Sequence, residues 1–385
     1  MSKLEELIQQ YCPDGVEYVP LSSIADLSRG KVISKDYIKD NGGDYPVYSS
    51  QSENEGILGR INSYMYDGKY LTWTTDGAYA GTIFRRLGKF NITNVCGLVK
   101  VNTPNVSMDF LYYWLYVEAP KYVYRGMGNP KLMSNVMGAI SVPVPPLPVQ
   151  EEIVRILDTF TELQAELQAE LQKRLQQYNY YRDNLLSFEG RTDVQWKKLN
   201  EVATVYDGTH QTPAYKESGI PFISVENIGN IYNSRKYISR EDFDKYKIKP
   251  RMGDVFMTRI GSIGVCAVFE KQADIAYYVS LALIRPNQDA VNSRYLKHII
   301  ESLTGCKELR KRTLVNAVPI KVNKDDIGKI VLPFPSLAEQ QKIVSILDRF
   351  DSLTNDLTEG LPAEIEKRRL QYEYYRDKLL TFKRK

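Results

Sequence analysis

Residues 153–160 read IVRILDTF, and residues 343–350 read IVSILDRF. A second pair of blocks comes after them, YNYYRDNLLSF at 178–188 and YEYYRDKLLTF at 372–382, which are identical at eight of eleven positions. Internal repetition is decisive for architecture because each copy must form the same structural unit. The chain of 385 residues is therefore interpreted as one unit written twice.

Each duplicated segment predicts a long amphipathic helix. Prolines at 143 and 145, and at 333 and 335, precede a start rich in Glu and Gln, which is a signal for helix entry. Apolar residues then recur at spacings of three and four, as from Ile153 to Tyr178. At about 1.5 Å per residue, each helix is predicted to be roughly 55 to 65 Å long.

The two copies differ in the middle of the predicted helix. The first holds the tetrapeptide LQAE twice in tandem, at 163–166 and 167–170. The second is four residues longer between its matched blocks, near Gly360 and Pro362. Because proline removes a helical hydrogen bond, this stretch is predicted to bend or break the second helix.

Two mixed segments lie before and between the helical ones and share landmarks despite strong divergence. VEYVPLSSIA at 16–25 corresponds to VQWKKLNEVA at 194–203, and YPVYS at 45–49 corresponds to IPFIS at 220–224. Alternating stretches followed by glycine-rich turns are typical of strands in small sheets.

The predicted fold class is α+β, with two divergent domains of mostly antiparallel sheet and short helices. Two long antiparallel helices are predicted to separate these domains, in an arrangement with an internal pseudo-twofold. The predicted divisions are 1–144 for the first variable domain, 145–188 for the central helix, 189–334 for the second variable domain and 335–385 for the C-terminal helix.

Composition narrows the class of protein. No stretch has enough consecutive apolar residues to span a membrane, and residues 1–10 lack the apolar core of a signal peptide, so a soluble cytoplasmic protein is expected. Four widely spaced cysteines and two histidines favour neither a metal site nor a disulfide framework. The net charge of +4 is too small to indicate nucleic-acid binding without local evidence.

The paired blocks, the LQAE tandem and TEGLPAEI at 358–365 resemble the specificity subunits of type I restriction-modification systems. The resemblance is greatest to the subgroup with tetrapeptide repeats in the central helix, and it covers essentially the whole chain. The variable domains match more weakly, through GTHQTP at 208–213, IPFISVEN at 220–227 and MTRIGSIG at 257–264.

This resemblance implies a non-catalytic subunit that binds double-stranded DNA sequence-specifically. Its two target-recognition domains would each read one half of an asymmetric, bipartite site. The implied partners are two methyltransferase subunits and translocase-endonuclease subunits. S-adenosylmethionine, ATP and Mg²⁺ would then serve those partners, with no cofactor in this chain.

The helix pair is also predicted to set the distance between the half-sites. Four helical residues span about 6 Å, while base pairs rise about 3.4 Å. Adding or removing one LQAE unit is therefore predicted to change the gap by one or two base pairs. The plainer interpretation, that these leucines pack on the partner helix, stands beside it.

Candidate base readers are polar side chains in predicted loops, since such groups can reach base edges in the major groove. In the first domain they are Ser49, Gln51, Ser52, Asn54, Thr74, Thr75, Asp76 and Tyr79. In the second they are Thr209, His210, Gln211, Thr212, Ser224, Glu226, Asn227, Thr258, Arg259 and Ser262. The same residue types also form turns and caps, so the alternative for each is a purely local role.

A further set of basic residues could neutralise phosphates, which positions a protein on DNA without specifying sequence. They are Lys31, Lys35, Arg85, Arg86, Arg125, Lys131, Arg235, Lys236, Lys245, Lys247, Lys249, Arg310, Lys311 and Arg312. A solvated basic face is the alternative.

The tyrosine-rich blocks repeat where the variable domains do not, which predicts a docking surface for identical partner subunits. Its residues are Tyr178, Tyr181, Arg182, Leu185, Tyr372, Tyr375, Arg376 and Leu379. The alternative is that these side chains close the helix pair on itself.

Motifs of the partner enzymes are missing from the sequence. The nearest approach to the (N/D)PP(Y/F) motif of adenine methyltransferases is Asn129-Pro130-Lys131, and every Gly-Lys pair lacks the Ser or Thr of a phosphate-binding loop. Two alternatives stay open: a two-headed protein-binding scaffold with a coiled-coil spacer and, less favoured, a self-sufficient DNA-modifying enzyme. Salt dependence distinguishes the scaffold, because phosphate contacts make DNA affinity fall steeply with salt.

Overall fold

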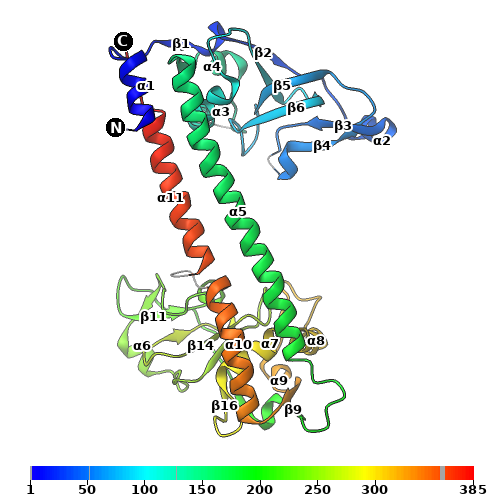
Figure 1. The fold of residues 1–385 in the computed structure, drawn as a ribbon. Helices are drawn as coiled ribbons and strands as arrows, with labels where there is room; N and C mark the ends of the chain where they lie inside the picture. Colours follow the sequence, from blue (N-terminus) through cyan, green and yellow to red (C-terminus); the bar gives the residue numbers. More distant parts are fainter. Residues whose placement is uncertain (1, 52, 127, 356–359) are drawn as a thin grey trace. The chain divides into compact units, whose positions relative to one another are not determined.

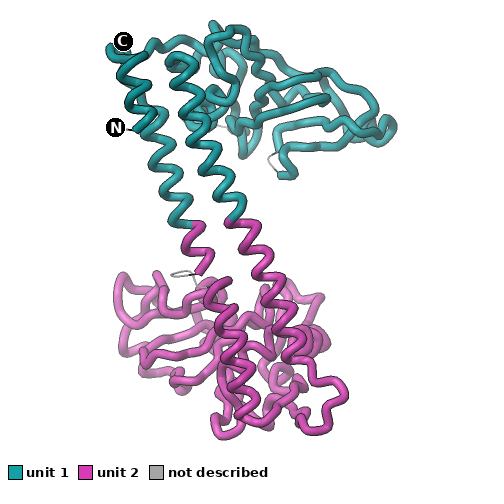
Figure 2. The backbone as a smooth tube through the Cα atoms, in the orientation of Figure 1, with its two compact units in different colours: residues 1–166, 366–385 teal, residues 167–365 magenta. Residues whose placement is uncertain are grey.

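The computed structural model describes residues 2–51, 53–126, 128–355 and 360–385 (Figure 1). The chain divides into two compact units (Figure 2). Unit 1 comprises Met1–Glu166 with Glu366–Lys385, and unit 2 comprises Leu167–Ile365. Each unit thus contains one of the two divergent segments together with parts of the long helices. The four-part division expected from the sequence stays a prediction beside this partition.

Unit 1 is built on a six-stranded sheet in the order β2-β7-β5-β6-β3-β4. Its strands are β2 (Ala25–Arg29), β3 (Gly42–Tyr48), β4 (Ile57–Ile61), β5 (Tyr66–Thr74), β6 (Ile83–Ile92) and β7 (Cys96–Val101). Neighbours are antiparallel except β3 and β6. A two-stranded ladder joins β1 (Tyr18–Pro20) to β8 (Ser141–Pro143). The short helices are α1 (Lys3–Tyr11), α2 (Lys35–Asp40), α3 (Met108–Glu118) and α4 (Ser134–Gly138).

Unit 2 repeats this plan with smaller sheets. One sheet has the order β10-β16-β13-β14, and a second has the order β12-β11-β15. The strands are β9 (Gln195–Lys198), β10 (Ala203–Asp207), β11 (Ile220–Ile223), β12 (Tyr237–Ile238), β13 (Val255–Thr258), β14 (Cys266–Val268), β15 (Ala276–Tyr277), β16 (Leu281–Pro286) and β17 (Val331–Phe334). The β9–β17 ladder corresponds to β1–β8. The short helices are α6 (Arg240–Asp244), α7 (Ser293–Glu301), α8 (Leu303–Arg310) and α9 (Lys324–Ile327).

The first long helix is unbroken and the second is not. Helix α5 (Leu147–Leu185) has 39 residues, about 58 Å at the usual rise. The second copy forms α10 (Leu337–Asn355) and α11 (Leu361–Leu379). Gly360 lies outside both helices and Pro362 lies in the first turn of α11, where proline is tolerated because its missing N–H is not needed. The expected break is confirmed.

Aromatic stacking joins these helices in each unit. In unit 1, where the end of α11 lies beside the start of α5 and runs antiparallel to it (Figure 1), Phe160 stacks on Tyr375. In unit 2, Tyr181 of α5 stacks on Phe350 of α10. Phe160 and Phe350 are the same position of the repeat, as are Tyr181 and Tyr375. The same contact is therefore built in each unit from matching positions of the repeat.

A buried glutamine attaches each sheet domain to its long helix. Gln150 accepts a hydrogen bond from Ser107 N (2.8 Å) and donates to the carbonyls of Asn105 and Pro145. In unit 2, Gln340 accepts from Asn292 N (2.9 Å) and donates to the corresponding pair of carbonyls. An amide side chain suits this position because it offers an acceptor and two donors. The same joint is thus built twice.

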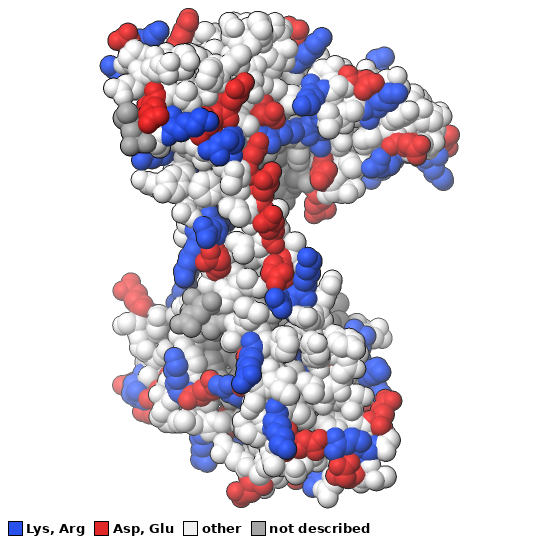
Figure 3. Space-filling model, in the orientation of Figure 1, with Lys and Arg blue, Asp and Glu red and all other residues white. Residues whose placement is uncertain are grey.

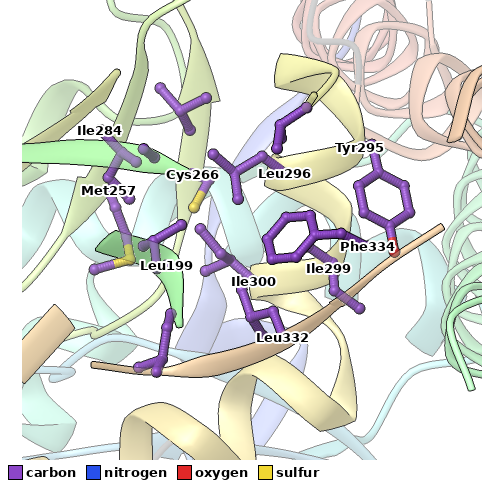
Figure 4. Packing of buried hydrophobic residues seen from close by; sticks show 14 of the residues in the cluster. Leu199, Met257, Cys266, Ile284, Tyr295, Leu296, Ile299, Ile300, Leu332 and Phe334 are labelled. Atoms are coloured by element: carbon purple, nitrogen blue, oxygen red, sulfur yellow. The ribbon is translucent and has the colours of Figure 1, made fainter. Parts of the chain in front are cut away.

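The main core of unit 2 lies between β13, β16 and β14 on one side and α7 on the other (Figure 4). Met257 and Ile284 face Leu296 and Ile300 in this layer, and Phe334 closes it beside Tyr295. These side chains are almost completely buried. The apolar face of α7 thus covers this sheet through Leu296, Ile299 and Ile300.

Within the described ranges, no helix combines the length and apolar character needed to cross a bilayer. In the same ranges, no three Cys, His, Asp or Glu side chains converge as a metal site would require. Cys12, Cys96, Cys266 and Cys306 are free thiols.

Candidate nucleic-acid interface

A pair of interlocked hairpins follows the central strand of each unit. In unit 1, residues 74–82 form a tight turn in which Gly81 N donates to Thr74 O, and Tyr124 and Lys131 exchange two backbone bonds at the base of a second hairpin. Gly77 N donates to Pro130 O (3.0 Å) and Leu132 N to Thr75 O (2.9 Å), which ties the two together.

Unit 2 has the same backbone bonds with different side chains. Gly264 N donates to Thr258 O, and Gly261 N donates to Ile320 O (2.9 Å). Val322 N donates to Arg259 O (3.0 Å), as Leu132 N does to Thr75 O in unit 1. The backbone hydrogen bonds of the paired hairpins are therefore the same in both units, while most of their residues differ. This pattern is consistent with two modules that bind different ligands.

Four of the expected base readers are buried in this structure, and their contact with bases stays a prediction. They are Thr74, Thr75, Thr258 and Arg259. Thr74 Oγ1 accepts a hydrogen bond from Thr82 N, and Thr258 Oγ1 accepts one from Val265 N, both at 3.0 Å. These hydroxyls close the hairpins, which is the local role that Ser and Thr often take in turns.

Arg259 connects three loops of unit 2. Its Nε donates to Val279 O (2.7 Å), its Nη1 donates to Val322 O (3.1 Å) and its Nη2 lies 3.2 Å from Asp207 Oδ1. Asp207 precedes the GTHQTP segment, and Val322 ends the second hairpin. Arg259 therefore positions the loops, whereas the sequence suggested a base contact.

The remaining expected base readers divide by exposure. Asn54, Tyr79, His210, Gln211, Thr212, Glu226 and Ser262 are exposed. Ser49, Gln51, Asp76, Thr209, Ser224 and Asn227 are half-buried. Several of the latter bond within their own loop, as Thr209 Oγ1 does with Gln211 N (3.3 Å) and Asn227 Oδ1 does with Ser224 N (3.1 Å). Ser52 lies outside the described residues.

Two of the expected phosphate contacts have structural roles instead. Arg86 is buried against the ring of Tyr48, with bonds to Thr72 Oγ1 and Glu55 O, and its burial lowers the pKa of the guanidinium. Arg85 pairs with Asp109 (3.1 Å) and Asp158 (3.2 Å).

Others are paired with acids. Exposed Lys131, Lys236, Lys245 and Lys311 each lie beside an Asp or Glu, as does half-buried Lys249, and half-buried Arg312 pairs with Glu308. Lys31, Lys35, Arg125, Arg235, Lys247 and Arg310 are also exposed. On the face drawn in Figure 3, basic and acidic side chains are interspersed in both units. That face therefore carries no single basic surface in either unit.

In each unit, an arginine of the sheet domain forms an ion pair with an aspartate of the long helix. The arginine lies on a strand in unit 1 and on the short helix α7 in unit 2. In unit 1, Arg85 pairs with Asp109 of α3 and reaches Asp158 of α5. In unit 2, Arg294 of α7 pairs with Glu270 (2.6 Å) and reaches Asp348 of α10. The aspartate belongs to the repeated ILDxF block in both cases.

The aspartate of each ILDxF block has a second partner from the short helix. In unit 1, Tyr113 Oη donates to Asp158, and in unit 2, His298 Nε2 lies 3.0 Å from Asp348. Burial disfavours ionised Asp348, but hydrogen bonds from His298 and Arg294 outweigh it and lower the pKa of the carboxyl. The aspartate of the ILDxF block is thus the same docking residue in both units. The side chains that bind it differ between the two sheet domains.

Most side chains predicted as the docking surface in the tyrosine-rich blocks make contacts within this chain. Tyr178 is buried with its hydroxyl 3.1 Å from His298 Nδ1, while Tyr181 and Tyr375 stack on the opposing phenylalanines. Tyr372 packs in the core of unit 1, and Leu185 and Leu379 are half-buried. Arg182 and Arg376 pair with the following aspartates. The alternative that these residues close the helix pair is therefore supported.

Tyr180 and Tyr374, the second tyrosine of each block, were not among the residues predicted from the sequence. They occupy the same repeat position and are 66% and 63% exposed. A helical projection from the inward-facing positions 178 and 372 would have placed them on the outer face, since residues two apart do not share a face.

Comparison with known proteins identifies relatives over nearly the whole chain. A family model described as a type I restriction modification DNA specificity domain matches residues 13–177 and again 192–367. A putative type I specificity subunit of Mycoplasma pneumoniae is 34% identical over 368 residues, covering 94% of this chain and 96% of that protein. The specificity subunit of the Escherichia coli type I restriction enzyme EcoR124I/EcoR124II is 35% identical over 295 residues, covering 71% of each chain.

Solved structures show the same fold at low sequence identity. The crystal structure of the type I restriction-modification S subunit from M. genitalium has a TM-score of 0.59 at 15% identity, covering 95% of this chain and 96% of that one. A structure described as explaining complex assembly and conformational transition of the type I system has a TM-score of 0.57 at 17% identity, covering 96% and 98%.

Proposed function

Because this chain belongs to the type I restriction-modification DNA specificity family, we propose that its two sheet domains read the two different halves of an asymmetric, bipartite site on double-stranded DNA. The observation that carries this proposal is the pair of interlocked hairpins, whose backbone bonds are the same in both units while their side chains differ. Duplex DNA presents equivalent groove edges on its two strands, so modules related by a pseudo-twofold suit inverted positions. Different side chains then imply different bases.

The exposed loop residues are the proposed base contacts. In unit 1 they centre on Tyr79 and Asn54, and in unit 2 on His210, Gln211, Thr212 and Ser262, which are exposed in the structure. The half-buried members, Ser49, Gln51, Asp76, Thr209, Ser224 and Asn227, are kept as proposed contacts of second rank because each retains some accessible surface. Exposed basic residues such as Lys31, Arg125 and Arg310 are proposed phosphate contacts, which fix position on the duplex.

The helical segments are proposed to set the gap between the half-sites. Helix α5 is continuous through both LQAE units. Removing four residues shortens a helix by about 6 Å, roughly the rise of two base pairs. The deletion also rotates the C-terminal part of the helix by about 40° around its axis, because four residues exceed one turn of 3.6.

Catalysis is proposed to lie in partner subunits. Two methyltransferase subunits would dock on the exposed outer face of the repeated helical blocks, where Tyr180 and Tyr374 occupy equivalent positions. Tyrosine is favoured at such interfaces because it combines apolar area with one polar group. Translocase-endonuclease subunits would complete the complex. S-adenosylmethionine, ATP and Mg²⁺ would be bound by these partners, which are proposed to act in the cytoplasm.

Methylome sequencing tests the proposal. Cells would express this chain with its cognate methyltransferase, either intact or lacking Leu167 to Glu170. The expected result is a bipartite methylated motif whose gap shortens by one or two base pairs in the deletion variant, with both half-sites unchanged. A control variant replaces the same four residues by four alanines, which preserves helix length and is expected to preserve the gap.

Other outcomes separate the alternatives. If no motif is methylated and the purified complex binds DNA without a steep salt dependence, the DNA proposal fails and a protein-binding scaffold is favoured. If the motif is bipartite but its gap is the same in the deletion variant, DNA recognition stands and the spacing role fails. Methylation by the chain alone, supplied with S-adenosylmethionine, would support a self-sufficient enzyme.

A further inference from the structure

The second hairpin of unit 2 exposes an unusual set of apolar side chains. Within residues 314–321, Leu314, Val315, Val318 and Ile320 are all exposed, and Val318 is 99% exposed. Branched apolar residues normally lie inside a protein, and fully exposing one forgoes about 1.5 kcal/mol or more of burial. A cluster of them on one surface loop marks an interaction site. We call residues 314–321 the apolar hairpin.

The apolar hairpin is held in place by several backbone bonds. Leu314 N donates to Lys321 O (2.8 Å), Ala317 N donates to Leu314 O (3.2 Å) and Gly261 N donates to Ile320 O (2.9 Å). At its base, Arg259 Nη1 donates to Val322 O. Because the loop is already ordered, little conformational entropy is lost when it binds. Its apolar tip is therefore a preformed surface.

Charge indicates the kind of partner. No acidic residue occurs from Leu309 to Lys324, and this stretch carries Arg310, Lys311, Arg312, Lys321 and Lys324. Glu308 pairs with Lys311 and Arg312, while Arg310, four residues before the hairpin, and Lys321, at its end, are exposed. Apolar groups flanked by cations match a groove of duplex DNA, where methyl groups lie between two rows of phosphates.

The corresponding hairpin of unit 1 differs in chemistry. Tyr124 and Lys131 exchange two backbone bonds at its base, and Gly77 N donates to Pro130 O as Gly261 N does to Ile320 O. It carries Arg125 and Asn129 where unit 2 has Val315 and Pro319. The segment from Ala119 to Gln150 is likewise free of acidic residues. The same backbone arrangement thus presents basic and polar side chains in unit 1 and valines in unit 2.

We propose that Val315 and Val318 of the apolar hairpin contact thymine 5-methyl groups in the major groove of the half-site read by unit 2. This inference rests on the proposed function. Val315 and Val318 are not among the polar residues proposed above as base contacts. The 5-methyl group is the apolar mark by which thymine differs from cytosine in that groove. Burying one methyl against a valine contributes about as much as one buried CH₂, roughly a fourfold effect on affinity.

Uracil substitution tests this contact, since uracil lacks only the methyl group of thymine. Duplexes containing the methylated motif would carry uracil at one thymine at a time. Their dissociation constants would be measured with the complex of this chain and its methyltransferase. For the intact chain, at least one thymine in the unit 2 half-site is expected to show a three- to tenfold loss on substitution. In V315S/V318S the same substitution is expected to change affinity less than twofold.

Two further variants keep the test interpretable. V315T/V318T preserves side-chain shape and one methyl of each valine, so it is expected to fold as the intact chain does and to show an intermediate uracil effect. M252S alters another exposed apolar side chain of unit 2, which precedes β13 while the hairpins follow it. It is expected to leave every uracil effect unchanged.

Several results would overturn the contact while leaving the proposed function intact. One is a unit 2 half-site without any A·T pair. Another is an equal uracil effect in the intact chain and in V315S/V318S. A third is loss of methyltransferase assembly in V315S/V318S with DNA discrimination unchanged, which would make the hairpin a protein contact. Failure of the intact complex to prefer its motif at all would instead remove the proposed function.

Discussion

Phe160 of α5 and Tyr375 of α11 stack with ring centroids 5.7 Å apart and planes inclined by 23°. The other half of the repeat has the same contact between Tyr181 and Phe350, at 5.4 Å and 28°. Each pair joins the ILDxF block of one copy to the YxYYRD block of the other. The repeated sequence is therefore explained by mutual packing: each block is alike in both copies because it faces its counterpart.

Removing this stack is expected to weaken unit 1 measurably. F160A and Y375A should each lower the free energy of unfolding by about 1–3 kcal/mol, because Phe160 is half-buried and Tyr375 is exposed apart from the ring face that covers it. A double-mutant cycle should give a coupling of about 1 kcal/mol, which is typical of an aromatic pair. Chemical denaturation provides the measurement. L370A, at an exposed position of α11, is the control and should change stability by less than about 0.5 kcal/mol.

The buried glutamine of each joint should be costly to remove. Q340A leaves Asn292 N and two carbonyls without their partner, so a loss of about 2–4 kcal/mol in unfolding free energy is expected. Q150A should behave alike in unit 1. Q168A, on the exposed surface of α5, is the matched control. A neutral result for Q340A in thermal and chemical unfolding would show that water replaces the amide.

Acid should loosen the contact between α1 and α5. Hydrogen bonds from Arg155 and Lys3, opposed by burial, lower the pKa of Glu152 from 4.5 to about 2. A lowered folded-state pKa stabilises the fold above the unfolded value, so this contribution is complete above about pH 4.5 and disappears as the pH falls toward 2.

E152Q should remove that contribution. At pH 7 we expect a loss of about 1–2 kcal/mol, because Lys3 and Arg155 are largely exposed and solvent screens the pairs. Between pH 4.5 and 2 the variant should show a shallower dependence of stability on pH than the intact chain. E151Q, beside it on the exposed face, should retain the intact chain's profile in the same denaturation series.

Arg259 is expected to act on DNA recognition through position. R259A leaves Asp207 without its ion pair and frees two carbonyls, so unit 2 should lose about 2–4 kcal/mol of stability. In the complex, single-base changes in the unit 2 half-site should reduce affinity less than they do for the intact chain. Single-base changes in the unit 1 half-site should reduce affinity as much as before. R259K should recover part of the stability. Competition binding with single-base variants of the motif measures both effects, and equal loss at the two half-sites would contradict a local role.

Assembly with the methyltransferase should depend on the exposed tyrosines. Y180A/Y374A is expected to leave unfolding free energy within about 0.5 kcal/mol and to weaken assembly at least tenfold, as loss of aromatic anchors does at interfaces. Titration of labelled subunits measures the affinity. K173A/R368A, on the same helices, is the control. Unchanged assembly in Y180A/Y374A would move the docking surface elsewhere.

The sequence by itself determined the duplication, the long helices and the break near Gly360. These features depend on local rules: a repeat, a 3.6-residue apolar period, and a glycine and proline that end a helix. The α+β class followed from alternating strands bounded by glycine turns. The family resemblance followed from the same blocks, because they carry the helix-to-helix contacts that both copies must keep.

Tertiary structure alone decided which loop residues are accessible. Thr75 and Arg259 are polar residues beside glycine turns, and the sequence around them does not show whether they are accessible. Both are buried where a segment some sixty positions later pairs with them: Leu132 N donates to Thr75 O and Val322 N donates to Arg259 O. The same long-range pairing turns Val315 and Val318 outward, although valine in a sequence suggests a core position. Exposure depends on what the rest of the chain covers, and that is set by contacts between residues far apart in the sequence.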